Sequence, residues 1–345
     1  MSRILLINQG HTDNLGDQAI DAVLGGFLRM QGMDVISVPY EEYVEDRVQF
    51  GFDGKHVLPR AARHLTALMD HWHRSRIRHI LNQAEHISAA VIGGGELLAV
   101  SHRGFASAFP IWCSELKARG IPVAVAGVSG DFVAGRLAQR FAHALHDCSY
   151  VSVRDHKTER ILRDEYGVQA TYHPDVVFSY TRLFPESVHT RPRDINLCIP
   201  VHFNAVLAES MGLNDERAYI DYLTRTLPHG TGDAAVLVAS TVSSEIYPEH
   251  VAQELCARGL DASSRTSLTL PSFIDMLNRT RFLLSGRMHA CILGLQYGCD
   301  VHAIPYREKL AVFSEEYGSS TTDVARVADA SYAGLEALAA ALEVR

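Results

Sequence analysis

The sequence lacks the signatures of several large enzyme and metal-binding classes. No Gly-x-Gly-x-x-Gly run follows the first apolar segment, and no Gly-x4-Gly-Lys-[Ser/Thr] run occurs anywhere. These absences exclude an ordinary dinucleotide-binding dehydrogenase and a P-loop enzyme. The six cysteines are scattered without a Cys-x-x-Cys pair. They therefore indicate a reduced, cytoplasmic protein rather than a disulfide or zinc framework.

Long apolar runs and excess positive charge are also lacking. No apolar stretch approaches the length of a membrane span, and the apolar run in Met1–Asn8 is too short for a signal peptide. The net charge of -8 argues against nucleic acid or an anionic membrane as the main partner. A hydrophobic content of 47% with 21% charged residues is typical of a globular protein.

The chain has an excess of histidine, eighteen in all, and several lie in a basic helical segment at Ala61–His86. His71 and His73 are two residues apart, which places them on different sides of a helix, so we expect no metal site there. We also expect no cofactor. We expect this helix to be a solvated or substrate-facing surface. It is compatible with peripheral contact with a membrane.

Strand-like and helical segments alternate along the chain, as is typical of parallel α/β architecture. The predicted strands are Arg3–Asn8, Asp34–Pro39, Ala89–Gly93, Pro122–Gly127, Tyr150–Arg154, Ala170–His173, Ile195–Val201, Ala234–Ala239, Arg281–Ser285 and Val301–Pro305. The predicted helices are Asp17–Met30, Ala61–His86, Ala108–Arg119, Ala134–His146, Lys157–Tyr166, Asp215–Leu227, Pro248–Arg258, Leu270–Arg279, Met288–Tyr297, Arg307–Tyr317 and Tyr332–Glu343.

A polar stretch without periodicity, Ser179–Asp194, separates two such series and contains Pro185 and Pro192. We therefore predict two doubly wound, Rossmann-like domains with an interdomain cleft. Residues 1–180 form the first domain, 181–194 a linker, 195–328 the second domain and 329–345 a C-terminal helix. Ligands of such sheets bind at the carboxyl ends of the strands.

The most informative segment is Ser285–Ala290, where a glycine turn joins a strand to an apolar helix. A helix start favours an anion, and this one carries Arg287 and His289. Arg287 is a permanent, fork-shaped cation, and a histidine can transfer a proton near neutral pH. The segment predicts a carboxylate or phosphate site with proton transfer. The alternative is that both side chains only solvate the helix end.

Two turns of the first domain follow strands in the same way. Asn14, Gly16 and Asp17 follow the first strand, where Asn14 or Asp17 could cap a helix and Gly16 could let the backbone approach a ligand. In Gly93–Glu96, exposed N–H groups of Gly94 and Gly95 could meet an oxyanion or a sugar hydroxyl, and a flexible turn is the alternative. We expect both turns on the first-domain side of the cleft, with Asp17 or Glu96 reaching hydroxyl groups of a substrate.

Three more charged residues occupy strand ends. Arg154 is expected to reach the cleft as a second anion clamp, unless it pairs with Asp155 or another acid. Asp175 could orient an arginine or accept from a hydroxyl. Lys309, after the strand Val301–Pro305, places a cation one strand beyond Arg287.

In order along the chain, these motifs resemble the polysaccharide pyruvyl transferase family. The matching residues are Asn14/Gly16/Asp17, Gly93–Gly95, Gly127-Val128-Ser129, Ser152/Arg154/Asp155, Pro174/Asp175, Arg287/Met288/His289 and Tyr306/Lys309. The resemblance covers residues 8 to 313, and it implies a glycosyltransferase-B-like fold of two domains.

The resemblance also implies an activity. Members move the enolpyruvyl unit of phosphoenolpyruvate onto a sugar as a cyclic pyruvate ketal, as in exopolysaccharide biosynthesis. It implies that Arg287 and His289 handle phosphoenolpyruvate, with His289 as the general acid, and that the acceptor is a sugar or lipid-linked glycan. Self-association is compatible with the sequence.

One departure from the family pattern is Asp131, in Gly127–Phe132, because an extra carboxylate opposes an anionic donor unless it is paired. Asp131 either faces the acceptor as a base, or the donor is not phosphoenolpyruvate. Two other functions are therefore weighed. One is a glycosyltransferase-like enzyme with the diphosphate of a nucleotide sugar on Arg287 and Lys309. The other is a non-catalytic binding protein of the same fold.

Overall fold

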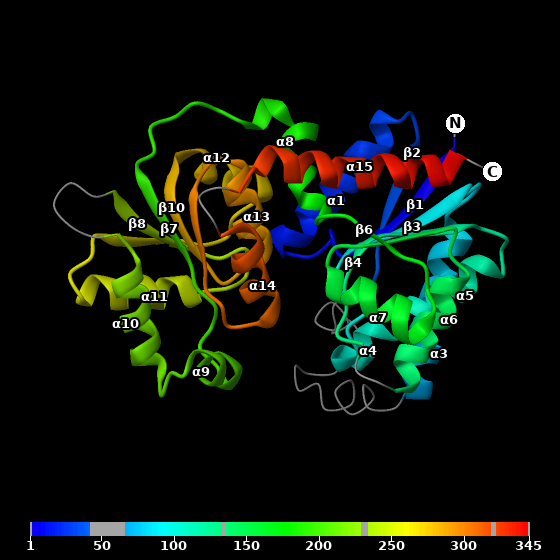
Figure 1. Ribbon diagram of the computed structural model, residues 1–345, viewed down its shortest axis with the longest axis horizontal. Helices are drawn as coiled ribbons and strands as arrows, with labels where there is room; N and C mark the ends of the chain where they lie inside the picture. The colour runs from blue at the N-terminus through cyan, green and yellow to red at the C-terminus, as the bar shows by residue number, and fades with distance from the viewer. Residues whose placement is uncertain (1, 42–65, 133–134, 229–233, 319–321, 344–345) are drawn as a thin grey trace. The chain divides into compact units, whose positions relative to one another are not determined.

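Two parallel sheets organise the computed structural model of the protein (Figure 1), which describes residues 2–41, 66–132, 135–228, 234–318 and 322–343. The residues group into two compact units. The first comprises Met1–Thr12, Ile20–Val176 and Asp329–Arg345, and the second comprises Asp13–Ala19 and Val177–Ala328. The short segment Asp13–Ala19 therefore belongs with the second unit, and the last helix belongs with the first.

The sheet of the first unit has the strand order β2-β1-β3-β4-β5-β6, and every neighbouring pair is parallel. The strands are β1 (Arg3–Asn8), β2 (Asp34–Pro39), β3 (Ala89–Gly95), β4 (Val123–Val128), β5 (Tyr150–Val153) and β6 (Thr171–Tyr172). Every residue of β3 and β4 is buried. Continuous burial is expected of central parallel strands, because helices cover both faces.

The helices of the first unit lie on both faces of this sheet. In Figure 1, α1 (Leu15–Met30) and α15 (Val324–Glu343) lie on one face, and α3 (Thr66–Gln83), α5 (Ala108–Lys117), α6 (Arg136–His146) and α7 (His156–Tyr166) lie on the other. Shorter elements follow β3, namely η2 (Val100–His102) and α4 (Arg103–Ala106). The strand order reverses between β1 and β3, which is the switch point of this sheet.

The sheet of the second unit has the order β11-β10-β7-β8-β9 and is also parallel throughout. Its strands are β7 (Ile195–Ile199), β8 (Ala235–Ala239), β9 (Ala262–Arg265), β10 (Thr280–Ser285) and β11 (Asp300–Ala303). Figure 1 shows α10 (Glu216–Thr226) and α11 (Tyr247–Ala257) on one side and α12 (Leu270–Arg279) on the other. The switch point of this sheet lies between β7 and β10. The remaining helices are α9 (Ala205–Met211), α13 (Met288–Gln296) and α14 (Glu308–Tyr317).

The predicted alternation of strands and helices is confirmed, and four local predictions need correction. The edge strand β9 and the short helix α9 were missed. The predicted linker contains helical turns, α8 (Tyr180–Leu183) and η4 (Pro185–Ser187), with η3 (Val176–Ser179) just before them. The last helix begins at Val324, eight residues before the predicted start.

The prediction for the histidine-rich segment was wrong in part. Helix α3 covers Thr66–Gln83, whereas residues 61–65 lie outside the described residues. His73, Arg76 and Ile77 are buried, so one side of α3 faces the interior of its unit rather than solvent. Arg76 donates hydrogen bonds to the carbonyl oxygens of Pro39 and Tyr40, which explains how a cation is accommodated there.

Helix α5 carries a buried carboxylate that ties α3 to α5. Glu115 Oε2 accepts from Arg78 Nε at 2.9 Å and Arg119 Nη1 at 3.3 Å, and its other oxygen lies 3.4 Å from Arg74 Nη1. Burial alone would raise the pKa of Glu115, but hydrogen bonds from Arg78 and Arg119 outweigh it and hold the pKa below its ordinary value.

We expect Glu115→Gln to lower the free energy of unfolding at neutral pH by about 1–2 kcal/mol, because hydrogen bonds to charged groups are lost and the guanidinium groups are partly exposed. A carboxyl with a lowered folded-state pKa stabilises above its unfolded pKa of about 4.3 and loses this effect as pH falls. The difference in melting temperature should therefore shrink below that pH. Glu336→Gln, at an exposed site of α15, is the matched control. A pH-independent difference would contradict the assignment.

Candidate functional site

The loop after β10 lies at the switch point of the second sheet. The N–H of Gly286 donates to the carbonyl of Ile199, at the end of β7, over 2.9 Å. A Cβ at position 286 would stand 3.0 Å from Val201 Cγ1, so the loops after β10 and β7 are in close contact. The hydroxyl of Ser285 accepts from the N–H of Arg287 at 2.9 Å and shapes the turn into α13. Arg287 and Met288–Ala290 thus occupy the position where open α/β sheets bind ligands.

Arg287 is the N-cap residue of α13, and its side chain makes no capping hydrogen bond. Its Nη2 donates to Glu245 Oε2 at 3.0 Å and lies 3.4 Å from Oε1. The Nε of Arg287 is buried and has no hydrogen-bond partner among the residues that the structure describes. Arg287 therefore holds a protein carboxylate on one nitrogen and keeps another buried donor unused.

Glu245 lies in the loop between β8 and α11. Its Oε2 also accepts a hydrogen bond from the hydroxyl of Ser240, which is buried and in turn accepts from the N–H of Val242 at 3.0 Å. The carboxylate is thus fixed from two sides, by a hydroxyl and by a guanidinium.

The segment before α1 pairs with this same loop. Leu15 N–H donates to the carbonyl of Thr241 at 2.7 Å, and Asn14 forms an antiparallel bridge with Val242. The carbonyl of Asp13 accepts from Ser243 N–H at 3.1 Å, and the Asp13 carboxylate accepts from the hydroxyl of Ser244. Both segments belong to the second unit.

Gly16 brings the early motif against His289. A Cβ at position 16 would lie 2.4 Å from His289 Nδ1 and 3.0 Å from its Cβ, closer than side chains can approach. Asn14 Oδ1 accepts from Gly16 N–H at 3.0 Å and sets the turn, and Asp17 lies in the first turn of α1. The sequence analysis placed this turn on the first-domain side, whereas it packs on loops of the second unit.

The loop after β11 adds Tyr306 to the same unit. Tyr306 is buried, and its Cε1 would stand 3.6 Å from a Cβ at Gly286. The guanidinium of Arg307 lies 5.5 Å from the centre of the Tyr306 ring. Lys309 lies in the first turn of α14, and a ligand contact for it stays a prediction.

Two thiols near this site are chemically inert. Burial raises the pKa of both Cys291, in α13, and Cys198, in β7, to about 12. Such thiols stay protonated at neutral pH and are not nucleophiles. Tyr247 follows Glu245, and burial together with a hydrogen bond to Glu216 raises the pKa of its hydroxyl.

The glycine turn after β3 has a packing role. Gly94 and Gly95 have φ of 80° and 87°, which favours glycine. A Cβ at Gly94 would stand 2.1 Å from Ile20 Cγ2, so the turn allows α1 to lie close to β3. A contact between Gly94, Gly95 or Glu96 and an acceptor stays a prediction.

Arg154 and Asp175 form a buried ion pair in the first unit. Arg154 Nη1 lies 2.8 Å from Asp175 Oδ2, and each side chain is only 6% exposed. Arg154 Nε donates to Ser129 Oγ at 3.0 Å. The alternative stated above, an arginine paired with an acid, is what the structure contains. A donor-binding role for Arg154 stays a prediction.

The carboxylate of Asp131 accepts hydrogen bonds from the protein backbone. Its oxygens accept from the N–H groups of Val100, at 2.6 Å, and Ser101, at 3.0 Å, at the start of η2. Asp155 likewise caps α7 by accepting from Thr158 N–H at 2.7 Å. Backbone donors at a helix start stabilise such a carboxylate, so Asp131 is accounted for without an acceptor substrate.

Glu245, Ser240 and Asp13 were missed by the sequence analysis. The polar run Ser240–Glu245 directly follows the apolar strand β8, so the rule that singled out the other strand ends could have found it. His202 also follows a strand of this sheet, β7, and its ring lies 4.5 Å from that of Tyr247. The pairing of Asp13–Leu15 with this loop has no sequence signal, because it joins segments more than 200 residues apart.

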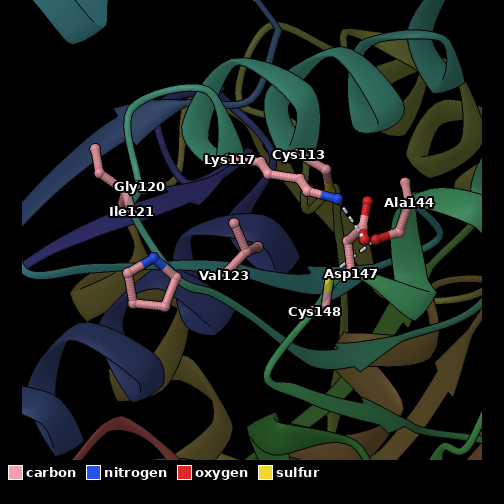
Figure 2. A pocket seen from close by; sticks show the side chains of 9 residues that line it. Cys113, Lys117, Gly120, Ile121, Val123, Ala144, Asp147 and Cys148 are labelled. Carbon is pink, nitrogen blue, oxygen red and sulfur yellow. Dashed lines mark hydrogen bonds and ion pairs between the residues drawn. The ribbon is translucent and has the colours of Figure 1, made fainter. Parts of the chain in front are cut away.

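A cavity of about 240 Å³ lies at the amino-terminal ends of the strands of the first sheet (Figure 2). It is lined by the end of α5, the start of β4 and residues just before β5, including Cys113 and Cys148. Lys117 and Asp147 point toward each other there, with Nζ 2.6 Å from Oδ1. That hydrogen bond lowers the pKa of Asp147. The amino-terminal edge of a parallel sheet is not where such folds bind ligands.

Comparison with known proteins identifies the family. A family model described as polysaccharide pyruvyl transferase matches residues 14–308. The chain belongs to this family. The match begins at Asn14 and includes both Arg287 and His289, which confirms the resemblance. No curated protein sequence matches the chain.

Solved structures share its fold at low sequence identity. UDP-GlcNAc 2-epimerase from Methanocaldococcus jannaschii has a TM-score of 0.55 and 13% identity, with 99% of this chain and 100% of that chain covered. A putative UDP-N-acetylglucosamine 2-epimerase from Listeria monocytogenes has a TM-score of 0.57 and 8% sequence identity. The match covers 97% of this chain and 88% of that chain. S. aureus MnaA in a UDP co-structure has a TM-score of 0.52 and 10% sequence identity. The match covers 96% of this chain and 87% of that chain. The predicted glycosyltransferase-B-like α/β class is thus confirmed.

In the part of the chain that the structure describes, no helix is both long and apolar enough to cross a membrane.

We expect Gly16→Ala to lower the free energy of unfolding by about 1–3 kcal/mol, because the new methyl group overlaps the His289 ring. Gly25→Ala, in the same helix, is the control. Its methyl group meets the far end of the Arg29 side chain and lies 3.6 Å from Leu6 Cδ2, an ordinary van der Waals distance, and alanine favours a helix by about 1 kcal/mol over glycine. Thermal unfolding measures both. Equal stability of Gly16→Ala and the wild type would show that this contact is absent in solution.

Proposed function

We propose that the protein transfers the enolpyruvyl group of phosphoenolpyruvate to a sugar and forms a cyclic pyruvate ketal on a precursor of a cell-surface polysaccharide. The observation that carries the proposal is the placement of Arg287 and His289 at the switch point of the second sheet, within the matched family region. A fork-shaped cation beside a group that transfers protons suits an anionic enol phosphate.

The chemistry needs an acid first and an electrophile next. Protonation of the C3 methylene by His289 makes C2 electrophilic, and one acceptor hydroxyl adds to C2 with loss of its proton. Breaking the bond between C2 and the phosphate oxygen releases inorganic phosphate. The second hydroxyl then adds to C2, loses its proton and closes the ketal. In this proposal, Arg287 binds an anionic group of the donor and Asp17 contacts an acceptor hydroxyl.

Other parts of the proposal rest on sequence and family resemblance. The acceptor is a sugar or a lipid-linked glycan, and the reaction is placed in the cytoplasm. Arg154 and Lys309 are proposed as further donor contacts, and Glu96 as a further acceptor contact. A second candidate function, transfer from a nucleotide sugar, is favoured by the fold neighbours, two of which are titled as UDP-GlcNAc 2-epimerases and one as a UDP co-structure.

A ligand panel separates the candidates. A ligand that binds only the folded state raises the melting temperature, by an amount that grows with the logarithm of 1 plus the ratio of ligand concentration to Kd. Phosphoenolpyruvate should stabilise the protein, and UDP-sugars should not. Stabilisation by UDP-sugars alone would favour the second candidate, and stabilisation by neither would favour a binding protein for another partner.

We expect Arg287→Lys to bind phosphoenolpyruvate much more weakly than the wild type. Lysine keeps the positive charge but is a point charge, so it cannot reproduce two parallel hydrogen bonds to one anion. Calorimetric titration with phosphoenolpyruvate measures the change. Arg307→Lys, at an exposed arginine of the next loop, is the control. An unchanged dissociation constant in Arg287→Lys would remove the clamp role.

We expect His289→Gln to retain donor binding and to lose turnover by about 10²–10⁴-fold, the usual contribution of a positioned acid or base. Glutamine keeps a hydrogen-bond donor but does not release a proton at neutral pH. Phosphate release at saturating phosphoenolpyruvate and acceptor measures turnover, and titration measures binding. Turnover within a few-fold of the wild type would leave the acid unassigned.

A further inference from the structure

The proposed anion-binding arginine already holds an anion that belongs to the protein. Arg287 Nη2 lies 3.0 Å from Glu245 Oε2, and the Glu245 side chain is only 18% exposed. A carboxylate in this position repels an anionic ligand and lowers its affinity. The structure therefore contains a feature that opposes donor binding, and it needs another reason to be there.

The carboxylate is held by more than the guanidinium. Ser240 is 3% exposed, and its hydroxyl donates to Glu245 Oε2, because a carboxylate oxygen can only accept. The same hydroxyl oxygen accepts from the N–H of Val242. The loop from Thr241 to Ser244 is fixed in turn by its pairing with Asp13–Leu15. The position of the Glu245 carboxylate is thus set by its own loop, and this carboxylate orients the guanidinium group of Arg287.

The Nε–H of the Arg287 guanidinium is available to donate a hydrogen bond to a ligand. Within the part of the chain that the structure describes, no group accepts a hydrogen bond from the buried Nε of Arg287, and a buried donor is costly unless a ligand or water supplies an oxygen. Because Glu245 engages Nη2, the rotation of the planar group is set, and with it the direction in which Nε–H points.

We propose that Glu245 is a positioning residue that fixes the rotation of the Arg287 guanidinium, so that Nε meets an oxygen of the donor, at the expense of affinity for the anion. This inference rests on the proposed function. A fixed fork improves turnover because the reacting group is held in one orientation, whereas charge alone would only tighten binding. Removal of the charge of Glu245 should therefore raise the affinity for an anion and lower turnover.

Two variants separate the two effects. Glu245→Gln keeps the shape and loses the charge, so inorganic phosphate should bind about threefold or more tightly, while turnover with phosphoenolpyruvate should fall about tenfold or more. Ser240→Ala keeps the charge and releases the anchor, so turnover should fall while the affinity for phosphate stays unchanged. Glu249→Gln, an exposed residue of α11, removes the same charge and should change neither.

Calorimetry with inorganic phosphate and steady-state phosphate release give the two readouts, and thermal unfolding confirms that each variant is folded. Weaker phosphate binding in Glu245→Gln, or unchanged turnover in both variants, would overturn the proposal. If the wild type does not turn over phosphoenolpyruvate, the proposed function fails. The positioning role, which is read from turnover, fails with it. The charge effect of Glu245 is judged separately by phosphate binding: it stands if Arg287→Ala loses binding and Glu245→Gln gains it, and falls otherwise.

Discussion

The close contact between Gly16 and the ring of His289 is the constraint on which the second unit depends. It leaves no space for a side chain at position 16 and sets the start of α1 against the loop after β10. The neighbouring residues Asp13–Leu15 then pair with the loop that carries Glu245, and Glu245 holds Arg287. Two motifs that lie at opposite ends of the chain thus become one arrangement. Their joint presence in the family region has a physical basis, because each positions the other.

Most of the fold could be predicted from the sequence because its strands are central and parallel. Such strands are buried on both faces and therefore read as continuous apolar runs, as in β3 and β4. The edge strand β9 has the sequence Ala-Ser-Ser-Arg and is largely exposed, so it has no such signal. The placement of Asp13–Ala19 with the second unit could not be predicted, because it results from contacts between distant segments and not from local pattern.

For the candidate site, sequence reasoning located cations more easily than their counter-ions. Arg287 and Arg154 stand at strand ends and were both singled out. An acid was expected as one alternative for Arg154, and Asp175 was expected to be able to orient an arginine, which the structure confirms. Glu245, which holds Arg287, was not singled out. Asp131 shows the converse. In the sequence, its negative charge argued against an anionic donor. In the structure, two backbone N–H groups donate hydrogen bonds to this carboxylate and stabilise its charge. A carboxylate has consequences for a ligand only once its hydrogen-bond donors are known.

Helix α15 makes the first unit discontinuous along the chain. Tyr332 packs edge-on against Phe27 of α1 with ring centres 5.4 Å apart, and the hydroxyl of Ser331 donates to the carbonyl of Asp175 at 2.9 Å. Gly334 lets the helix lie directly on His173. During synthesis, the ribosome releases the whole second unit before these residues emerge. Until then, one face of the first sheet carries α1 without α15, and the first unit completes its folding only after the second unit has been translated.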